Sequence, residues 1–588
     1  MSSTVKIGNC SGFYGDRVSA MREMLEGGDL DYLTGDYLAE LTMLILGRDV
    51  MKDPSTGYAK TFVRQMAECM ALAKEKSVKI VADAGGLNTV GLADKLKQIA
   101  AEQGIDVSIA YVEGDDLRAR ADELGWQGAM TANAYLGAFG IAAALNAGAD
   151  IVVTGRVTDA SVVLGPAIAH HGWGREDFDA LAGAVVAGHI IECGTQACGG
   201  NFAGFKDLMA QGHFDRPLGF PIAEIDADGS FVVTKHEGTG GAVTVDTVTA
   251  QLVYEIQGEQ YLNPDVTTHF STIQLAQEGT DRVRVSGVKG SPPPITTKVC
   301  LNFFGGFRND AELLITGLDQ DEKVALLRAQ VEQALAVKAA AGLELPKLEW
   351  TFNRSDVPDP ATQEAGTSVL RVHAESASAD PVGREFSNIM IELALASLPG
   401  FTASSSPPSP GRTFGFYKPG YLPQADVPHV VVLADGTRID IPPPTNVVES
   451  PSGFEADLRS TPQPPSGAVE HAPLGRLAYA RSGDKGGDAN IGVWIPANTP
   501  DREGAVAWLI ALLTPQRIKE LLPETADLDV EVHVLPNLGG LNILVRGILG
   551  QGVAASARLD PQAKALGEWL RARHVDIPAH FLKGEFVA

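Results

Sequence analysis

The stretch Val78-Lys79-Ile80-Val81-Ala82-Asp83-Ala84-Gly85-Gly86-Leu87-Asn88 predicts a buried strand that is followed by a polar, glycine-rich loop. The first five residues form an apolar run of strand length. A helical pattern follows at residues 90–103, and Gly104 is its expected end. Strand and helix patterns alternate in this way through roughly the first 200 residues. This alternation predicts βαβ units, and therefore an α/β body with a large parallel or mixed sheet.

Polar loops follow three of the expected strands. They are Asn9-Cys10-Ser11-Gly12, Asp83 to Asn88, and Thr154-Gly155-Arg156-Val157-Thr158-Asp159-Ala160-Ser161. In an open parallel sheet, ligands bind beyond the carboxyl ends of the strands. We therefore expect the polar side chains of these loops to converge on one cleft. Helix capping is the alternative for any single loop, because Thr158, Asp159 and Ser161 are good N-cap residues.

A fourth loop, Glu192 to Asn201, combines a carboxylate, two cysteines and a glycine turn. A zinc site needs tighter cysteine pairs than Cys193 and Cys198 and a second pair elsewhere, so no metal is expected. Glu192 is the stronger candidate, because a carboxylate beside such a turn serves as a general acid or base when burial raises its pKa. The thiols fit two small buried cysteines, and a thiol nucleophile is the alternative. Whether Cys10, Cys193 or Cys198 reacts stays open.

The stretch Arg481-Ser482-Gly483-Asp484-Lys485-Gly486-Gly487-Asp488-Ala489-Asn490 lies between two strand-like runs, residues 474–480 and 491–495. A connection between strands needs only a short turn. Here it carries two cations, two carboxylates and three glycines, which let a backbone approach a ligand and orient it. These features predict a binding loop, and a solvated surface loop is the alternative.

Composition and charge exclude several classes of partner. The chain has 588 residues, of which 45% are hydrophobic and 20% charged, as in ordinary globular enzymes. The net charge of −26 disfavours nucleic acid and anionic membranes as partners. No apolar run reaches the length of a membrane span, and five cysteines are too few for a disulfide scaffold, so a cytoplasmic protein is expected. From His471 onward the chain carries 12 Lys and Arg against 13 Asp and Glu, so the charge lies almost entirely before this point.

The pattern changes along the chain and indicates domains. We expect an α/β body at residues 1–448 that is possibly subdivided near residue 237, a Pro/Ser-rich linker at 449–472, and a small α+β domain at 473–588. Residues 242–256 and 281–288 are rich in Thr, Val and Tyr and predict antiparallel strands.

The motifs resemble the acyclic terpene utilisation protein A (AtuA) family. The resemblance covers roughly residues 5–448 and rests on Gly8-Asn9-Cys10-Ser11-Gly12-Phe13-Tyr14-Gly15-Asp16, Ala82 to Asn88, Val153 to Ser161, and Glu192-Cys193-Gly194. The tail, with Arg481 to Asn490 and Asn537-Leu538-Gly539-Gly540-Leu541-Asn542, resembles the ferredoxin-like domain that accompanies this family. The resemblance implies catabolism of citronellol- and geraniol-type compounds beside acyl-CoA carboxylases and enoyl-CoA hydratases. It implies no established set of catalytic residues.

Two functions fit the sequence. The first is an enzyme, of hydratase or lyase type, that acts by acid–base chemistry on a branched acyl-CoA or related carboxylate without a cofactor. The second is a non-catalytic accessory protein for an acyl-CoA carboxylase pathway. A homo-oligomer is expected in either case. The candidate catalytic residues are Asp83, Asp159 and Glu192, and the candidate binding residues are Asn9, Ser11, Asn88, Arg156, Thr158, Arg481, Lys485, Asp488 and Asn490. We expect the tail domain to dock over the cleft, with Arg481 and Lys485 facing it.

Overall fold

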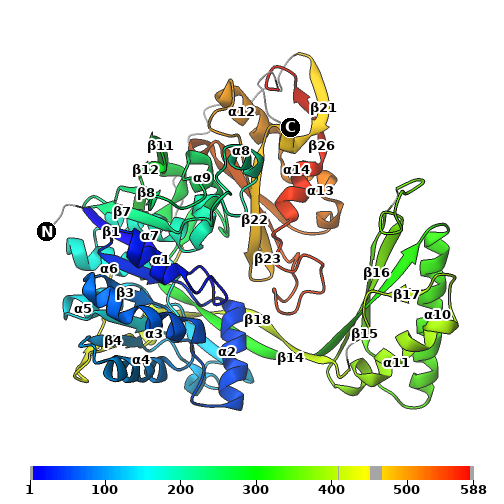
Figure 1. The fold of residues 1–588 in the computed structure, drawn as a ribbon, viewed down its shortest axis with the longest axis horizontal. Coiled ribbons are helices and arrows are strands. Elements are labelled where there is room, and N and C mark those ends of the chain that lie inside the picture. Colours follow the sequence, from blue (N-terminus) through cyan, green and yellow to red (C-terminus); the bar gives the residue numbers. More distant parts are fainter. Residues whose placement is uncertain (1–3, 356, 408, 451–466, 583–588) are drawn as a thin grey trace. The chain divides into compact units, whose positions relative to one another are not determined.

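The computed structural model describes residues 4–355, 357–407, 409–450 and 467–582. Its chain divides into two compact units. The main unit comprises Met1–Asn302, Tyr417–Val553 and Asp560–Ala588, and the second unit comprises Phe303–Phe416 and Ala554–Leu559. These divisions fall at other positions than residues 237 and 448, because the chain passes between the units along two long strands, β14 (Thr296–Thr316) and β18 (Arg412–Pro423) (Figure 1). Residues 451–466 of the expected linker lie outside the described residues.

The described part of the main unit contains one eleven-stranded sheet with the order β11-β12-β8-β7-β1-β2-β3-β6-β4-β19-β20. The parallel strands are β1 (Thr4–Asn9), β2 (Tyr32–Gly35), β3 (Lys79–Ala82), β6 (Ile151–Thr154) and β4 (Ile109–Glu113). The flanking strands pair antiparallel and are β7 (Pro221–Asp226), β8 (Phe231–Lys235), β11 (Gln274–Gly279), β12 (Arg282–Ser286), β19 (Val430–Val432) and β20 (Arg438–Asp440). The predicted α/β body with a mixed sheet is confirmed.

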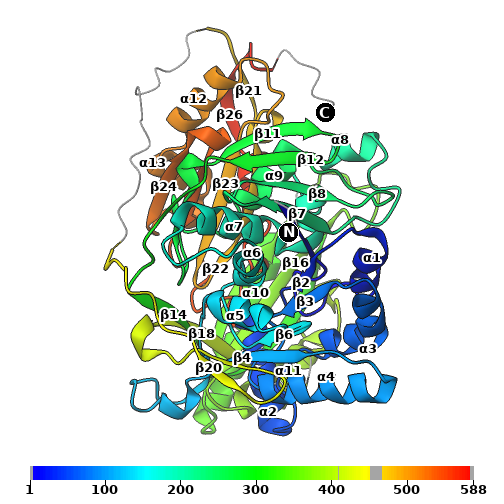
Figure 2. The ribbon, with the colours of Figure 1, turned by 90° about the vertical axis from the view of Figure 1, so that its left-hand side faces the viewer.

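Helices cover both faces of the parallel strands, because successive strand residues point to opposite sides. Ile80 and Ala82 belong to one hydrophobic core, and Val81 belongs to the other. The first core is covered by α1 (Ala20–Gly27), α3 (Lys60–Glu75) and α4 (Thr89–Gln103), and the second by α5 (Phe139–Asn146), α6 (Ser161–His171) and α7 (Phe178–Ile191) (Figure 2). None of the described helices is long and apolar enough to cross a bilayer.

The predicted strand at residues 242–256 is wrong, since helix α9 (Val245–Leu252) occupies this segment. Its start explains the error. The Thr244 side chain accepts a hydrogen bond from the Thr247 backbone N–H, and the Thr247 side chain accepts one from the Thr244 backbone. This reciprocal cap outweighs the β-propensity of the Thr and Val residues. The second predicted strand is confirmed as β12.

The tail folds as an α+β domain within the main unit, as predicted. Its antiparallel sheet consists of β22 (Tyr479–Lys485), β23 (Asp488–Trp494), β25 (Gly540–Val545) and β24 (Val530–Leu535). Helices α12 (Arg502–Leu512), α13 (Pro515–Leu521) and α14 (Leu566–Ala572) and the pair β21 (Val469–Pro473) and β26 (His574–Pro578) complete it. The domain has a hydrophobic core of its own, which includes Ile491, Leu509 and Leu570.

A long loop was predicted at residues 481–490. This prediction is wrong, because most of these residues belong to the two strands of the β22–β23 hairpin. The turn itself is Gly486 and Gly487, and Gly486 has a φ of +68°, which favours glycine. Arg481 and Ser482 are 6% and 1% exposed. Polar residues that resembled a solvated loop are therefore strand residues with partners inside the protein.

The second unit is a sheet covered by helices on one face. Its strands are β15 (Lys347–Asn353), β16 (Thr367–Ser376), β14 and β17 (Thr402–Ala403), and its helices are α10 (Gln320–Ala340) and α11 (Arg384–Glu392). Leu370 and Val372 of β16 pack into the helix-covered core. The alternate residues Arg371, His373 and Glu375 carry a cluster of charges.

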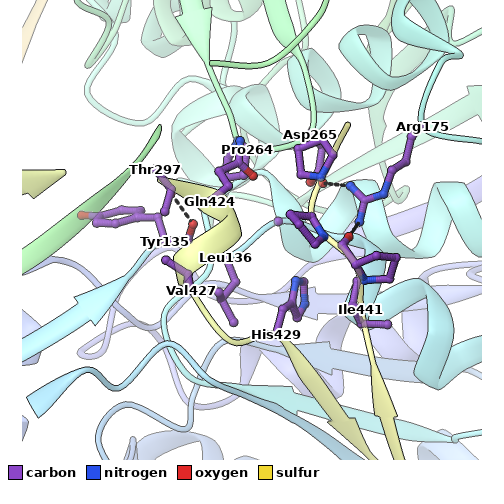
Figure 3. A pocket seen from close by; sticks show the side chains of 14 residues that line it. Tyr135, Leu136, Arg175, Pro264, Asp265, Thr297, Gln424, Val427, His429 and Ile441 are labelled. Atoms are coloured by element: carbon purple, nitrogen blue, oxygen red, sulfur yellow. Dashed lines mark hydrogen bonds and ion pairs between the residues drawn. The ribbon is translucent and has the colours of Figure 1, made fainter. Parts of the chain in front are cut away.

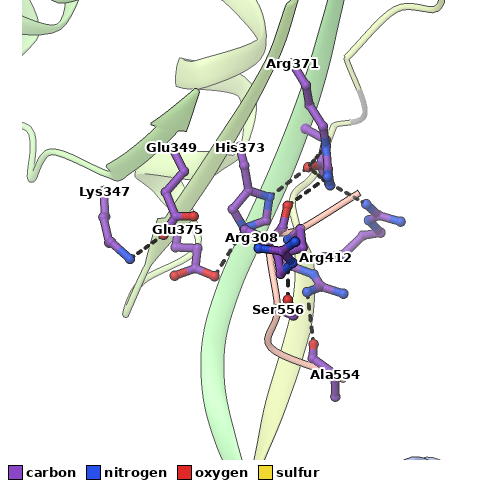
Figure 4. Close-up of polar contacts among 12 residues, drawn as sticks. Arg308, Lys347, Glu349, Arg371, His373, Glu375, Arg412, Ala554 and Ser556 are labelled. Carbon is purple, nitrogen blue, oxygen red and sulfur yellow. Dashed lines mark hydrogen bonds and ion pairs between the residues drawn. The ribbon is translucent and has the colours of Figure 1, made fainter. Parts of the chain in front are cut away.

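This charged cluster is centred on Asp310 (Figure 4). The Asp310 carboxylate accepts hydrogen bonds from Arg371 at 2.6 Å, from His373 Nδ1 at 2.7 Å and from Arg412 at 2.8 Å. Burial acts to raise the pKa of Asp310, but the bonds from His373 and Arg371 hold it well below its usual value. The other ring nitrogen of His373 lies 3.1 Å from Glu375, and both carboxylates raise the pKa of His373 against the effect of burial. Each charge in this cluster has an opposite partner.

Candidate functional site

The carboxyl ends of the parallel strands bring buried polar residues to one edge of the main sheet. Asn9 ends β1, Asp36 follows β2, Asp83 follows β3, Asp115 lies beyond β4 and Arg156 lies beyond β6. Each of the five is at most 7% exposed. This edge is the usual ligand side of an open α/β sheet, and the strands hold the residues there rigidly.

Arg156 lies at the centre of the edge. Its Nη1 is 2.8 Å from Asp159 Oδ1, 3.6 Å from Asp83 Oδ2 and 2.8 Å from the Leu38 carbonyl that accepts its hydrogen bond. The guanidinium lies 4.3 Å from the centre of the Tyr135 ring. Because these contacts occupy it inside the protein, Arg156 orients the two carboxylates and is not accessible to a bulky ligand.

Glu192 reaches the same edge from the end of helix α7. Asn9 fixes this helix end, because its Nδ2 donates to the carbonyls of Ile191 and Glu192, both at 2.8 Å. The Glu192 side chain is 5% exposed, and its Oε1 lies 3.3 Å from Nδ1 of His189. Carboxylate oxygens of Asp36, Asp159 and Glu192 lie within 4.8 Å of one another. The predicted candidates Asn9, Asp83, Arg156, Asp159 and Glu192 therefore come together, and Asp36 joins them.

The carboxylates of this edge are more numerous than the cations beside them, and their pKa values reflect this. Burial raises the pKa of Asp83 to about 7, against the effect of Arg156. Burial also raises the pKa of Asp36 and of Glu192 well above the usual values; Asp83 adds to the shift of Asp36, and Asp159 adds to that of Glu192. Carboxyl groups of this kind hold protons near neutral pH, which suits general acid–base chemistry.

The tail hairpin brings a cation to this edge. Lys485 Nζ lies 5.7 Å from the centre of the Tyr261 ring, which packs 5.0 Å from the His189 ring. Burial lowers the pKa of His189 to about 4, and the charge of Lys485 acts in the same direction. The same charge lowers the pKa of Glu192. The hairpin also brings Asp484, whose pKa burial raises to about 7.

Two of the predicted tail residues, Arg481 and Asn490, hold the tail domain against the rest of the main unit. Arg481 donates to the Gln196 side chain and, at 3.1 Å, to the Asn201 carbonyl. Asn490 donates to the Val253 carbonyl at 2.7 Å and accepts from the Glu255 N–H at 2.8 Å. Asp488 instead pairs with Arg546 at 2.9 Å inside the tail domain. Arg481 and Asn490 therefore dock the tail, and Lys485 is the member of the predicted set that reaches the carboxylates.

The remaining predicted binding residues have local roles. Asn88 caps α4, since its side chain accepts from the Gly91 N–H at 3.0 Å. Thr158 shares a 2.6 Å hydrogen bond with Ser161 at the start of α6, and Ser11 donates to the Phe13 carbonyl at 3.0 Å. The capping interpretation thus accounts for Asn88 but not for Thr158, Asp83 or Asp159, since no side chain caps α6.

The thiols of the candidate loops are poor nucleophiles. Burial raises the pKa of Cys10 and Cys193 strongly, and it raises the pKa of Cys198 to about 12. The thiol and not the thiolate is therefore the resting form of each. Two buried cysteines beside a glycine turn are the better description of Cys193 and Cys198.

Several residues of the site were not predicted from the sequence. Asp36 follows β2, a four-residue strand that was not assigned, although Tyr32-Leu33-Thr34 is typical of a strand. Glu40 accepts from Lys298 and from the Tyr135 hydroxyl, at 3.0 and 2.8 Å, next to the ring that stacks on Arg156. Lys298 comes from β14, and no local pattern connects it with the sheet edge.

A separate cavity opens on the other side of Tyr135 and contains none of the carboxylates described above (Figure 3). Its described lining residues are Tyr135, Leu136, Gly137, Arg175, Pro264, Asp265, Thr297, Gln424, Val427, His429, Ile441, Pro442, Pro443 and Pro444. Arg175 donates to the Pro442 carbonyl and lies 3.8 Å from Asp265, which accepts from the Ala138 N–H. These contacts tie the proline segment to the sheet and indicate a structural role.

The fold and the site together define an α/β protein with an acidic carboxyl edge and a fused, small α+β domain. Two family models match the chain: the acyclic terpene utilisation family protein AtuA over residues 5–433, and the AtuA ferredoxin-like domain over residues 472–576. The chain therefore belongs to the acyclic terpene utilisation family AtuA, and its tail is a ferredoxin-like domain. A comparison with curated proteins found no match.

Proposed function

We propose that this member of the acyclic terpene utilisation family is an enzyme that acts by acid–base chemistry on a branched, terpenoid-type acyl-CoA or related carboxylate. The reaction is a hydration, a dehydration or a carbon–carbon cleavage. One observation carries the proposal: Asp36, Asp83 and Glu192 are buried together, and burial raises the pKa of all three carboxyl groups. Hydration and cleavage beside a thioester both require a group that donates or removes a proton.

The environments of the carboxylates suggest separate roles. Asp83 has a pKa of about 7, so it exchanges a proton readily at neutral pH. Burial also raises the pKa of Glu192 well above its usual value, which suits a group that donates a proton. Asp159 is the member whose side chain reaches solvent, with 29% of its side chain exposed, and it is the first to meet a substrate. Arg156 acts as a positioning residue for Asp83 and Asp159.

Lys485 supplies the positive charge that an anionic substrate or an enolate-like oxygen needs. The net charge of the chain disfavours an acyl-CoA or a carboxylate over most of its surface. Lys485 is a compact point charge next to the Gly486–Gly487 turn of the hairpin. The carboxylates and this cation together support a site for proton transfer beside a carbonyl group.

Two experiments test the proposal. Mass spectrometry of the purified full-length protein should detect a retained CoA thioester or carboxylate. Incubation with branched acyl-CoA compounds in D₂O should then place deuterium next to the thioester. The Asp83→Asn variant should lose this exchange by about 100-fold or more. Asp265→Asn, which removes a buried aspartate outside the site, should leave it unchanged. Binding of an acyl-CoA without any exchange in the wild type would contradict the proposal.

The accessory function is the second candidate, and exposed apolar residues of the second unit favour it. Leu395 is fully exposed, Leu318 is 82% exposed and Val337 is 67% exposed. Apolar residues at a surface are typical of contacts with a partner protein. A leucine-to-glutamate change at Leu395 separates the two functions. It should leave proton exchange intact in an enzyme, and it should abolish the effect on a carboxylase if the protein is only an assembly factor.

A further inference from the structure

We propose that Asp36, Asp159 and Glu192 bind a divalent cation of the oxygen-preferring class, such as Mn²⁺ or Mg²⁺. Their carboxylate oxygens lie within 4.8 Å of one another, which is close enough for one ion to contact all three. All three ligands are carboxylates, the ligand type that selects these ions over softer metals. The proposal does not depend on the reaction proposed above, since ion binding can be measured without a substrate.

A second, independent feature points to a ligand at this place. His189 is 2% exposed, and its Nδ1 lies 3.3 Å from Oε1 of Glu192. Within the described part of the chain, neither ring nitrogen of His189 makes a hydrogen bond of normal geometry, although the Leu252 carbonyl is near enough to act on the ring. A buried imidazole without a partner is costly unless something else engages it. As a neutral ring beside Glu192 Oε1, it serves as the group that orients this carboxylate.

The balance of charge favours a cation as the missing partner. Asp36, Asp83, Asp159 and Glu192 form a group with Arg156 inside it, and Lys485 acts on it from the hairpin. Glu255 also acts on Glu192, so the carboxylates of this region outnumber the cations. A divalent ion would offset this excess of negative charge. Glu192 Oε2 is also buried and lacks a hydrogen-bond partner among the described residues.

The three ligands are held in place by neighbouring contacts, as a metal site requires. The backbone N–H of Asp36 donates to the Ser11 carbonyl at 3.0 Å. Arg156 fixes the Asp159 carboxylate at 2.8 Å, and Asn9 fixes the backbone of Glu192 at 2.8 Å. The ligands come from the segment after β2, the loop before α6 and the end of α7. No metal was expected from the sequence, because these segments are far apart in the chain.

The test is a titration of the full-length protein with Mn²⁺ after treatment with EDTA, followed by isothermal titration calorimetry and by the electron paramagnetic resonance signal of the free ion. We expect one Mn²⁺ to bind per chain, competition by Mg²⁺, and a rise in melting temperature with Mn²⁺ concentration. Absence of saturable binding to the wild-type protein overturns the proposal.

Matched variants locate the ion. Glu192→Gln and Asp36→Asn preserve the size of the side chain and remove one charged ligand each. Each should weaken Mn²⁺ binding by at least the roughly 10- to 100-fold that is typical for loss of a supporting group. Asp265→Asn should bind Mn²⁺ like the wild type, because it removes a buried carboxylate in the separate cavity. Equal Mn²⁺ affinity in the wild type, Glu192→Gln and Asp36→Asn would place the ion elsewhere and overturn the proposal.

Discussion

Two charge clusters of this protein, a partly buried one in the second unit and a buried one in the main unit, differ in the balance of their charges. In the second unit, Asp310 is surrounded by His373, Arg371 and Arg412, and its pKa is held well below the usual value. At the carboxyl edge of the main sheet, Asp83 shares Arg156 with other carboxylates, and burial raises its pKa to about 7. The first cluster is complete within the protein, whereas the second needs a proton or a ligand.

The difference teaches where to look for function. A balanced buried cluster satisfies its own charges and has no need of a partner, although it contains His, Asp and Arg residues that resemble catalytic groups. An unbalanced cluster costs folding free energy, and such a cost is typical of sites that carry out chemistry. Charge balance therefore distinguishes the two better than residue type does.

The largest effect is expected for loss of the central arginine. Arg156→Met leaves Asp83 and Asp159 buried without their cation, so the free energy of unfolding should fall by about 3–5 kcal/mol. Arg371→Met in the second unit should cost less, about 1–3 kcal/mol, because His373 still donates to Asp310. Chemical denaturation of both variants measures the two values. A larger loss for Arg371→Met would reverse the comparison.

Removal of a carboxylate should have opposite signs in the two clusters. At about pH 8, Asp83→Asn relieves a repelling charge and should raise stability or leave it unchanged, since the amide oxygen still accepts from the Tyr37 N–H. Asp310→Asn removes an ion pair and should lower the free energy of unfolding by about 2 kcal/mol. Thermal melts of the two variants measure these changes in stability. A loss of stability in both variants, or a gain in both, would contradict the prediction.

Replacement of Lys485, the cation of the hairpin, is expected to have an intermediate effect, which is on ligand affinity. Lys485→Ala should weaken binding of an acyl-CoA or carboxylate by about tenfold, equal to about 1.4 kcal/mol, while the melting temperature hardly changes. Lys564→Ala provides a matched control, because that lysine belongs to the tail domain but its Nζ bonds to the Tyr254 hydroxyl. Equal affinity in the wild type and in Lys485→Ala would remove the hairpin from the site.

The pH dependence of stability tests whether Asp83 is protonated in the folded protein. The pKa of Asp83 is raised in the folded protein from 3.8 to about 7. A raised pKa contributes stability that is complete below the unfolded value and is lost as pH rises through the folded value. The advantage of Asp83→Asn over the wild type should therefore grow from about pH 5 to about pH 8. An advantage that does not depend on pH would show that Asp83 stays ionised.

The sequence predicted which edge of the sheet carries the site, but it did not identify all of the residues that form the site. The strand ends identified Asp83 and Arg156, because a buried strand followed by a polar loop is a local pattern. Asp36 was missed because β2 has only four residues. Lys298 is brought to the edge by a strand almost 300 residues into the chain, and no local pattern shows such a contact. Arg481 and Asn490 were predicted to bind a ligand. In the structure they bond to a distant part of the chain, and the local sequence of a hairpin does not show such contacts.

The second unit illustrates the same limit. The sequence already shows a long helical pattern at residues 319–340, which is a local signal, and α10 spans Gln320–Ala340. The boundary of the unit was not predicted, since it lies within the two long strands β14 and β18. The balance of its charged cluster depends on Asp310, Arg371 and Arg412, which come from three different strands.

The contrast between the clusters is tested most directly by infrared difference spectroscopy of the full-length protein, which detects the carbonyl stretch of protonated carboxyl groups. At about pH 7, after treatment with EDTA to remove divalent ions, the wild type should show this band, and it should shrink in Glu192→Gln and in Asp83→Asn but not in Asp310→Asn. Absence of the band in the wild type, or its loss in Asp310→Asn alone, would contradict the account.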